Sequence, residues 1–260
     1  MAVERPDTRA IWTANAPAWI ELTRAGFDVY RDFVNTPAFL AMLPRLDGLR
    51  CLDLGCGEGS NTRLLAARGA AVVALDIAEV FIDAATQADP ERACAYVLGD
   101  GAVLPFRASS FDLVTAFMSL MDVADPEVTL VELARVLRPG GTLQFSVLHP
   151  ATSTPVRRWV RDEDGRREGL LIADYFQQGP VSDSWTFSTA PPEVRARHRA
   201  FEMTYARRTL TGWFQAVTAA GLTLEAIDEP HPDEATAAAH PEVADTRIVP
   251  YSLIIRARRP

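Results

Sequence analysis

The sequence of 260 residues contains no lysine, because all 26 of its Lys-or-Arg positions are arginine. A Schiff-base lysine for pyridoxal phosphate or for an aldolase is therefore excluded. The lysine that a P-loop directs at nucleotide phosphates is excluded for the same reason.

The sequence is also poor in cysteine, with three residues, Cys51, Cys56 and Cys94. They form no CxxC pair and no histidine lies near them in the chain, so neither a disulfide framework nor a zinc site is expected. We predict reduced thiols packed in or near the core, and no metal site.

Long hydrophobic runs are missing as well. No stretch approaches about 18 uninterrupted apolar residues, which is the length that a membrane span needs. The segment Met1–Pro6 shows no apolar leader. We therefore expect a cytoplasmic protein that does not insert into membranes.

Positive charge is in the minority, with 26 Lys and Arg against 34 Asp and Glu and a formal net charge of −8. A field of this sign repels a phosphate backbone, so nucleic acid is not expected as a partner. Apolar residues make up 48% of the chain, which is typical of a globular protein. The length fits a single domain over residues 1–260, as a monomer or a homodimer.

Strands and helices alternate through residues 48–148. Apolar segments predict strands at 50–54, 71–75, 95–98, 111–116 and 142–148, and helices at 60–67, 78–87 and 126–137. Asp125-Pro126 is typical of a helix start, and Pro139-Gly140-Gly141 predicts a tight turn. Repeated strand–helix–strand units form right-handed crossovers, so we predict an α/β fold with a doubly wound, mostly parallel sheet.

Three other regions surround this predicted core. Residues 8–47 show helical spacing and form a predicted N-terminal helical arm. Residues 150–206 break the rhythm, with a hairpin predicted around Asp164-Gly165 and irregular chain near Pro180 and Pro191. An insertion of this length is usually a lid or a substrate wall. Residues 207–260 close the domain with a helix and two strands.

A Gly-rich turn, Gly55-Cys56-Gly57-Glu58-Gly59, follows the first strand and opens a helix. Such a turn exposes backbone N–H groups at a helix N-terminus and is typical of a nucleoside or anion site. Dinucleotide dehydrogenases use a similar turn, so the turn alone leaves the ligand open. Asp53 precedes it within the strand, and an acid there suits a ligand with cationic parts better than a pyrophosphate.

The next two strands also end in acids. Asp76 could accept hydrogen bonds from both ribose hydroxyls. Asp100, in Gly99-Asp100-Gly101, could accept from an adenine amino group, a contact that a dehydrogenase does not require. Each acid has a plainer explanation: a bond to the turn's backbone for Asp53, a helix cap for Asp76 and an Asp-Gly turn for Asp100. Their occurrence at successive strand ends favours S-adenosylmethionine.

At these residues the sequence resembles the class I S-adenosylmethionine-dependent methyltransferases, with a type 11-like methyltransferase domain. Five segments carry the resemblance in order: 52–59, 73–77, 99–106, 111–114 and 133–141. The resemblance implies a Rossmann-like methyltransferase fold whose seven-stranded sheet has its last strand antiparallel, a donor-binding core over residues 48–148, and S-adenosylmethionine as the cofactor.

The resemblance also implies which residues hold the cofactor. Asp53 and the glycines of the turn surround the methionine part. Asp76 and Ile77 hold the ribose and flank the adenine, and Asp100 and Gly101 bind the adenine edge. The full cofactor set is Asp53, Gly55, Cys56, Gly57, Gly59, Asp76, Ile77, Asp100, Gly101, Ala102, Phe117 and Met118.

Two residues are candidates for a catalytic base. His149 follows the strand at 142–148, whose carboxyl end should face the cofactor, and imidazole titrates near neutral pH. The alternative is that His149-Pro150 only turns the chain. Asp122, past the fourth strand, could orient an acceptor or take its proton, or it could form a local cap before Pro126.

Four residues are candidates for acceptor binding: Trp19 and Tyr30 in the arm, Tyr175 in the insertion and His231 after a strand end. The alternatives are packing of the arm on the sheet for the first two and a plain loop position for His231.

The favoured hypothesis is methyl transfer from S-adenosylmethionine to an O, N or C atom of a small-molecule metabolite, because the acidic charge and the insertion favour an enclosed pocket. An NAD(P)-dependent oxidoreductase is one alternative. A non-methylating S-adenosylmethionine-binding protein on the same fold is another, since a fold does not determine a function.

Overall fold

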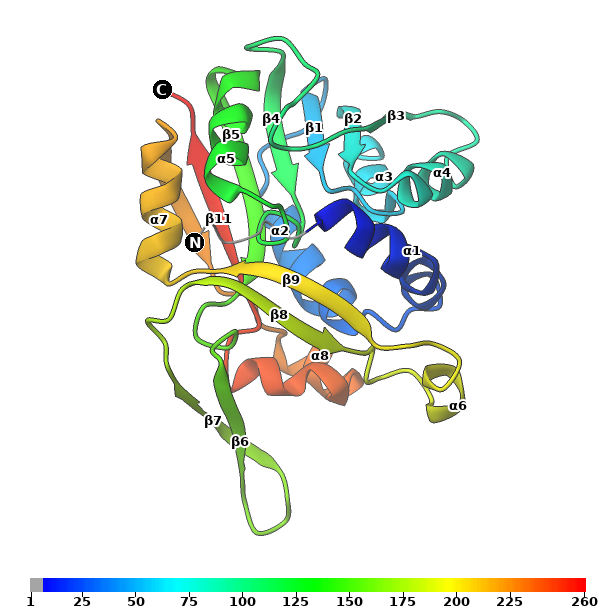
Figure 1. Cartoon of the computed structure of the whole chain (residues 1–260), viewed down its shortest axis with the longest axis vertical. Helices are drawn as coiled ribbons and strands as arrows, with labels where there is room; N and C mark the ends of the chain where they lie inside the picture. Colours follow the sequence, from blue (N-terminus) through cyan, green and yellow to red (C-terminus); the bar gives the residue numbers. More distant parts are fainter. Residues whose placement is uncertain (1–6) are drawn as a thin grey trace.

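The computed structural model describes residues 7–260, and the segment 1–6, where no leader is expected, lies outside the described residues. A seven-stranded sheet in the order β10-β11-β5-β4-β1-β2-β3 forms the centre of the molecule (Figure 1). Its strands are β1 (Arg50–Leu54), β2 (Ala71–Asp76), β3 (Cys94–Leu98), β4 (Phe111–Ala116), β5 (Leu137–Leu148), β10 (Thr223–Asp228) and β11 (Ser252–Arg258). Neighbours pair in parallel except where β11 meets β5 and β10. The predicted, mostly parallel sheet with an antiparallel last strand is confirmed.

Helices cover both faces of the sheet. Successive strand residues point to opposite faces, and apolar side chains on each face pack against helices. Leu52 packs in the core that α5 (Pro126–Val136) and α7 (Leu210–Ala219) complete. Its neighbour Cys51 packs on the other side with Leu65 of α3 (Ser60–Ala66). Helix α4 (Glu79–Gln87) connects β2 to β3. Burial on both faces explains why the strands read as continuous apolar runs.

Helix ends follow the local sequence signals. The Asp125 side chain accepts a 3.0 Å hydrogen bond from the Val128 N–H, and Pro126 occupies the first turn, as predicted. The segment Pro139-Gly140-Gly141 differs from the prediction. It lies within β5 as a bulge, where the register against β4 jumps from Phe111↔Leu137 to Leu113↔Thr142.

The N-terminal arm is helical, as predicted. It consists of α1 (Thr8–Arg24), a π-helical turn η1 (Arg31–Asn35) and α2 (Thr36–Met42). Ala16 of α1 packs against Ala78 and Phe81 at the start of α4, so the arm lies over the carboxyl ends of the strands.

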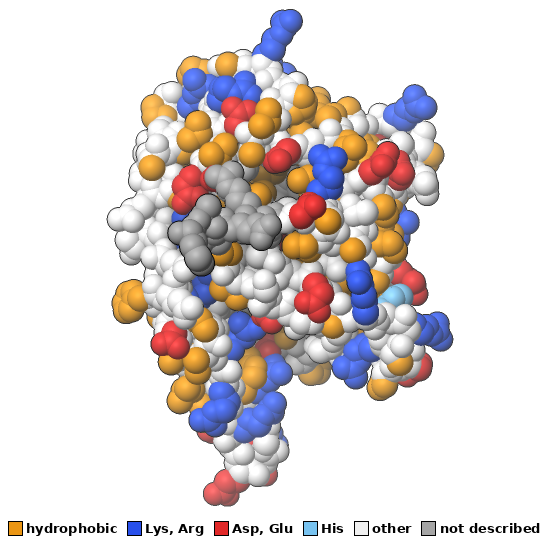
Figure 2. All heavy atoms as spheres, in the orientation of Figure 1, with side chains coloured by type: hydrophobic (Ala, Val, Ile, Leu, Met, Phe, Trp, Pro, Cys, Tyr) orange, Lys and Arg blue, Asp and Glu red, His pale blue; other side chains and the backbone are white. Residues whose placement is uncertain are grey.

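The insertion contains two hairpins instead of the one predicted. The predicted hairpin is β6 (Val156–Arg161) with β7 (Arg167–Ala173), which projects from the body and carries crowded acidic and basic side chains (Figure 2). The second is β8 (Gly179–Trp185) with β9 (Phe201–Arg207), joined through α6 (Pro192–Arg195). Proline predicted irregular chain here, but Pro180 fits β8 because this strand belongs to a two-stranded sheet with free edges.

The closing region follows the prediction in outline. After α7 and β10 come α8 (Glu234–Ala239) and the 3-10 helix η2 (Pro241–Arg247), which the sequence pattern did not predict. Within residues 7–260, no helix has both the length and the apolar character that crossing a membrane requires.

Candidate functional site

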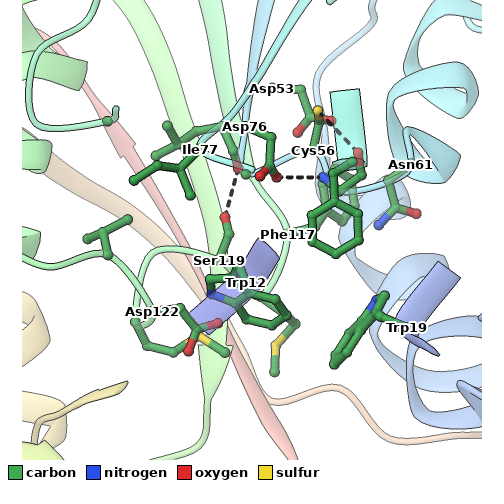
Figure 3. A pocket seen from close by; sticks show the side chains of 18 of the residues that line it. Trp12, Trp19, Asp53, Cys56, Asn61, Asp76, Ile77, Phe117, Ser119 and Asp122 are labelled. Carbon is green, nitrogen blue, oxygen red and sulfur yellow. Dashed lines mark hydrogen bonds between the residues drawn. The ribbon is translucent and has the colours of Figure 1, made fainter. Parts of the chain in front are cut away.

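A cavity of about 240 Å³ opens at the carboxyl ends of the parallel strands. It lies between the Gly-rich turn, the ends of β2 to β4 and the N-terminal arm (Figure 3). Ten of the predicted cofactor residues line it: Asp53, Gly55, Cys56, Gly57, Asp76, Ile77, Asp100, Gly101, Phe117 and Met118. Gly59 and Ala102 lie outside the lining, since Gly59 caps α3 with φ +80° and the Ala102 N–H turns back to the Asp100 carboxylate.

Asp53 is buried at the end of β1 and is held by two hydroxyl groups. Thr62 donates to its Oδ2 at 2.6 Å and Thr115 donates to its Oδ1 at 2.9 Å. Burial raises the pKa of Asp53 to about 6, although both hydroxyl bonds favour the charged form. The side-chain partners come from α3 and β4, so Asp53 does more than cap its own turn.

Asp76 joins the Gly-rich turn to the second strand. Its Oδ2 accepts a 2.9 Å bond from the Gly57 N–H, and its Oδ1 accepts a 2.9 Å bond from the Ala78 N–H. Burial raises the pKa of Asp76 to about 6. Each oxygen keeps a second lone pair, so the carboxylate can still accept bonds from a ligand in the cavity.

The turn can approach a ligand only because its glycines lack side chains. Gly55 has φ +68°, and a Cβ there would lie 2.4 Å from the Ser119 Cβ. Ser119 is itself held by a 2.7 Å bond from its Oγ to the Leu54 carbonyl. Glu58, which would face a pyrophosphate, is instead bound at 3.2 Å by Arg24 of α1 and by Arg63 of α3.

The sequence analysis missed the polar residues that the arm contributes to this cavity beside its aromatic ones. Trp12, Asp28, Arg31 and Asn35 all line it. Asn35 donates to the Ser146 Oγ at 3.1 Å, while its Oδ1 is buried and finds no hydrogen-bond partner within residues 7–260. Helical periodicity showed that the arm is a helix but gave no signal of which polar residues face the sheet.

The two candidate bases occupy different surroundings. Asp122 lines the cavity, is 6% exposed, and its Oδ1 has no hydrogen-bond partner among the described residues. Burial alone raises the pKa of Asp122 well above its usual range. A local cap therefore does not explain this side chain.

His149 does not line the cavity, contrary to our expectation. Its Nε2 lies 2.7 Å from the Glu229 carboxylate, and its Nδ1 accepts a 3.1 Å bond from the Ala151 N–H. Burial lowers the pKa of His149 although Glu229 opposes this. The imidazole connects the end of β5 to the loop after β10, which supports the turn explanation.

A second cavity, of about 340 Å³, adjoins the first and shares Asp28, Leu148, Trp185, Met203 and Tyr251 with it. Its walls come from the arm, both hairpins of the insertion and the segment before β11. The insertion thus contributes a wall of the second cavity, and its role as a substrate lid or wall stays a prediction.

The four candidate acceptor residues separate into two groups. Trp19 lines the first cavity and Tyr30 lines the second. Tyr175 lines neither, because its hydroxyl accepts a bond from the Leu210 N–H at the start of α7. His231 is exposed and lines neither. Among residues 7–260 no group of three or more His, Cys, Asp or Glu side chains is arranged to hold a metal ion.

Comparison with known proteins agrees with this geometry. Residues 52–145 match the family model of the methyltransferase domain. A solved S-adenosylmethionine-dependent methyltransferase from Mesorhizobium loti is 31% identical, with a TM-score of 0.72 over 86% of this chain and 96% of that one.

Curated relatives are similar over shorter stretches. The malonyl-[acyl-carrier protein] O-methyltransferase of Salmonella typhimurium is 29% identical over 75% of this chain and 70% of its own length. The demethylmenaquinone methyltransferase of Clavibacter sepedonicus is 42% identical over 37% of this chain and 40% of its own. Several matches span less than two thirds of the relative, from 22% to 64%. The solved relative matches over nearly its whole length and is 31% identical. The chain belongs to the S-adenosylmethionine-dependent methyltransferases.

Proposed function

We propose that this protein transfers the methyl group of S-adenosylmethionine to an O, N or C atom of a small-molecule acceptor. One observation carries the proposal: Asp53, Asp76 and Asp100 lie at or just beyond the carboxyl ends of β1, β2 and β3, around a single cavity that Asp122 also lines. Bound there, the cofactor supplies a methyl group already activated on a sulfonium, so the protein's main task is to position the acceptor.

The residues of the cavity fit this cofactor. Six acidic residues and one arginine line it, which suits a ligand that carries an ammonium and a sulfonium group. Among the described residues, no donor binds the buried Oδ1 atoms of Asn35 and Asp122, so each can accept a hydrogen bond from the ligand. Asp76 retains lone pairs for ribose hydroxyls, and Asp100 lies at the adenine end.

A small acceptor is supported by the covering of the site. The arm and the insertion enclose the adjoining cavity, which leaves room for a metabolite-sized molecule. The names of the two curated relatives specify different acceptors, so they select none for this chain. Trp19 and Tyr30 remain our candidates for acceptor contacts.

Asp122 is the residue that we propose to contact the acceptor during transfer. Its Oδ1 has no partner among residues 7–260, so the carboxylate can accept a proton or a hydrogen bond from the attacking group. A hydroxyl acceptor needs such a base, and burial raises the pKa of Asp122, which makes its carboxylate a stronger base than an exposed one. We do not propose His149 as the base, because its Nε2 is bonded to the Glu229 carboxylate.

Calorimetric titration with S-adenosylmethionine, S-adenosylhomocysteine and NAD tests the cofactor site. We expect both sulfur compounds to bind and NAD not to bind. Binding of NAD alone would overturn the proposal in favour of an oxidoreductase.

Turnover is tested by incubating metabolite extracts with methyl-labelled cofactor. Label is expected in at least one small molecule. Binding of the cofactor with label in no metabolite would favour the non-methylating alternative.

A further inference from the structure

The second cavity has an aromatic lining that the sequence analysis did not foresee. Rings of Phe27, Tyr30, Trp159, Trp185, Phe187 and Tyr251 line it. Tyr30 and Tyr251 are stacked with their centroids 4.6 Å apart, and Trp185 of β8 meets Trp19 of α1 edge-on at 5.4 Å. Aromatic side chains in a cavity lining favour a ligand with a flat or bulky apolar body and can attract cations.

The charge around the two cavities is predominantly negative. Six acidic residues line the first cavity and three line the second, with Asp28 common to both, against one arginine in the first and two in the second. Both arginines of the second cavity are already paired: Arg157 binds Asp183 at 2.9 Å, and Arg167 binds Asp245. No guanidinium in that lining is left free to receive an anionic group.

Asp28 lines both cavities and Asp122 lines the first, and we call the region between these two acids the junction. Asp122 is 94% buried, since its exposed fraction is 6%, and its Oδ1 has no partner among the described residues. Figure 3 shows Asp122 beside Trp12, with Trp19 on the other side of the view. Asp28 lines both cavities and accepts a 3.3 Å bond from the Arg31 N–H, while the Arg31 Nε is 3.9 Å from its Oδ2. Tyr251 lines both cavities; burial chiefly raises its pKa, and the charges of Asp28 and Asp122 add to the shift.

We propose that the acceptor is a small aromatic amine, whose ring lies in the second cavity and whose nitrogen is held between Asp28 and Asp122 at the junction. This inference rests on the proposed function, because the nitrogen is placed to meet the cofactor's methyl group. Carboxylated and phosphorylated acceptors are disfavoured, since they would meet the excess of carboxylates without a free arginine.

The transfer step balances for an amine. The nitrogen lone pair forms the new N–C bond while the bond between the methyl carbon and sulfur breaks, and sulfur keeps that electron pair. The methylated nitrogen then gives up a proton, which a carboxylate at the junction accepts. Asp122 and Asp28 hold the N–H groups, so the lone pair can point toward the first cavity.

Three probes of one shape test the proposal: phenethylamine, phenylacetate and 2-phenylethanol. Their binding is measured by calorimetry or ligand-observed NMR on the full chain saturated with S-adenosylhomocysteine. We expect phenethylamine to bind at least about ten-fold more tightly than phenylacetate, a difference of about 1.4 kcal/mol. 2-Phenylethanol should fall between them.

Variants identify the groups responsible. Asp122→Asn and Asp28→Asn should each reduce the preference for phenethylamine by several-fold. Asp112→Asn is the matched control. Asp112 is a half-buried carboxylate at the end of β4 away from the cavity, where it forms ion pairs with Arg50 and Arg138. It should keep the preference.

The possible failures are distinguishable. Absence of S-adenosylhomocysteine binding would overturn the proposed function and this inference with it. If that ligand binds but phenylacetate binds as tightly as phenethylamine, or none of the probes binds, only the amine proposal is overturned. An unchanged preference in both junction variants would also overturn it.

Discussion

The Asp76 carboxylate accepts a 2.9 Å hydrogen bond from the Gly57 N–H, 19 positions earlier in the chain. This bond connects the end of β2 to the Gly-rich turn after β1. The same carboxylate faces the cavity, so one side chain shapes the turn and offers acceptors to the ligand. Loss of this carboxylate should therefore disturb both the turn and the ligand.

Replacing Asp76 with alanine should weaken S-adenosylhomocysteine binding about ten-fold or more, because bonds to a charged acceptor contribute about 1.5–3 kcal/mol each. Calorimetric titration measures the change. Asp112→Ala serves as the control, since it removes a carboxylate far from the cavity and should leave the affinity unchanged. Equal affinities for Asp76→Ala and the wild type would contradict the ribose role.

The Gly55→Ala variant should lose both stability and cofactor affinity. The added Cβ would meet the Ser119 Cβ at 2.4 Å, and φ +68° is unfavourable for alanine. We expect a loss of about 2–4 kcal/mol in the free energy of unfolding, from overpacking and backbone strain together.

Gly48→Ala is the matched control for this variant. Gly48 has φ +73°, but a Cβ there meets nothing within 4 Å. It should cost about 1 kcal/mol from strain alone and leave ligand affinity intact. Urea unfolding and calorimetry compare the two, and similar losses in both would show that the approach to Ser119 is unimportant.

Acidification should stabilise the ligand-free protein through Asp53. Burial raises its native pKa to about 6, from 3.8, so between these values the native state binds more protons than the unfolded state. The free energy of unfolding therefore rises as the pH falls through 6, and Asp53 contributes about 1 kcal/mol between pH 7.5 and 5. Asp76 and Asp28 act in the same direction, whereas His149 opposes them because burial lowers its pKa.

The Asp53→Asn variant isolates this effect. Its free energy of unfolding should show about 1 kcal/mol less pH dependence than that of the wild type over the same range. Urea unfolding at the two pH values gives the comparison. An identical pH dependence in both proteins would show that Asp53 does not titrate in this window.

Arg207 should hold the insertion in place. It is 2% exposed and donates to the carbonyls of Ser153, Asp174, Tyr175 and Gln177. Arg207→Met leaves these carbonyls without a donor, so we expect a loss of about 3 kcal/mol and faster proteolysis within residues 150–206. Arg158→Met, at an exposed position of β6, is the control and should change neither. Cleavage at the wild-type rate in Arg207→Met would contradict the anchoring role.

Much of the cofactor side of the site could be predicted from the chain. The apolar runs of β1, β2 and β3 are plain in the sequence, and the carboxyl ends of these parallel strands meet at one edge of the sheet. Asp53, Asp76 and Asp100 lie at or just beyond those ends. Local signals sufficed there because each residue is placed by its own strand. The same reasoning failed for His149, which also follows a strand end but turns to Glu229, a partner 80 positions away.

The sequence by itself determined the doubly wound sheet, the Gly-rich turn and the acids around it, because periodicity and turn chemistry act over a few residues. Tertiary structure alone decided what faces those acids. The arm brings Trp12, Asp28 and Asn35 over the strand ends, and the β8–β9 hairpin brings Trp185 to Trp19. These contacts join segments far apart in the chain, and their choice depends on packing between whole elements, which no local pattern records.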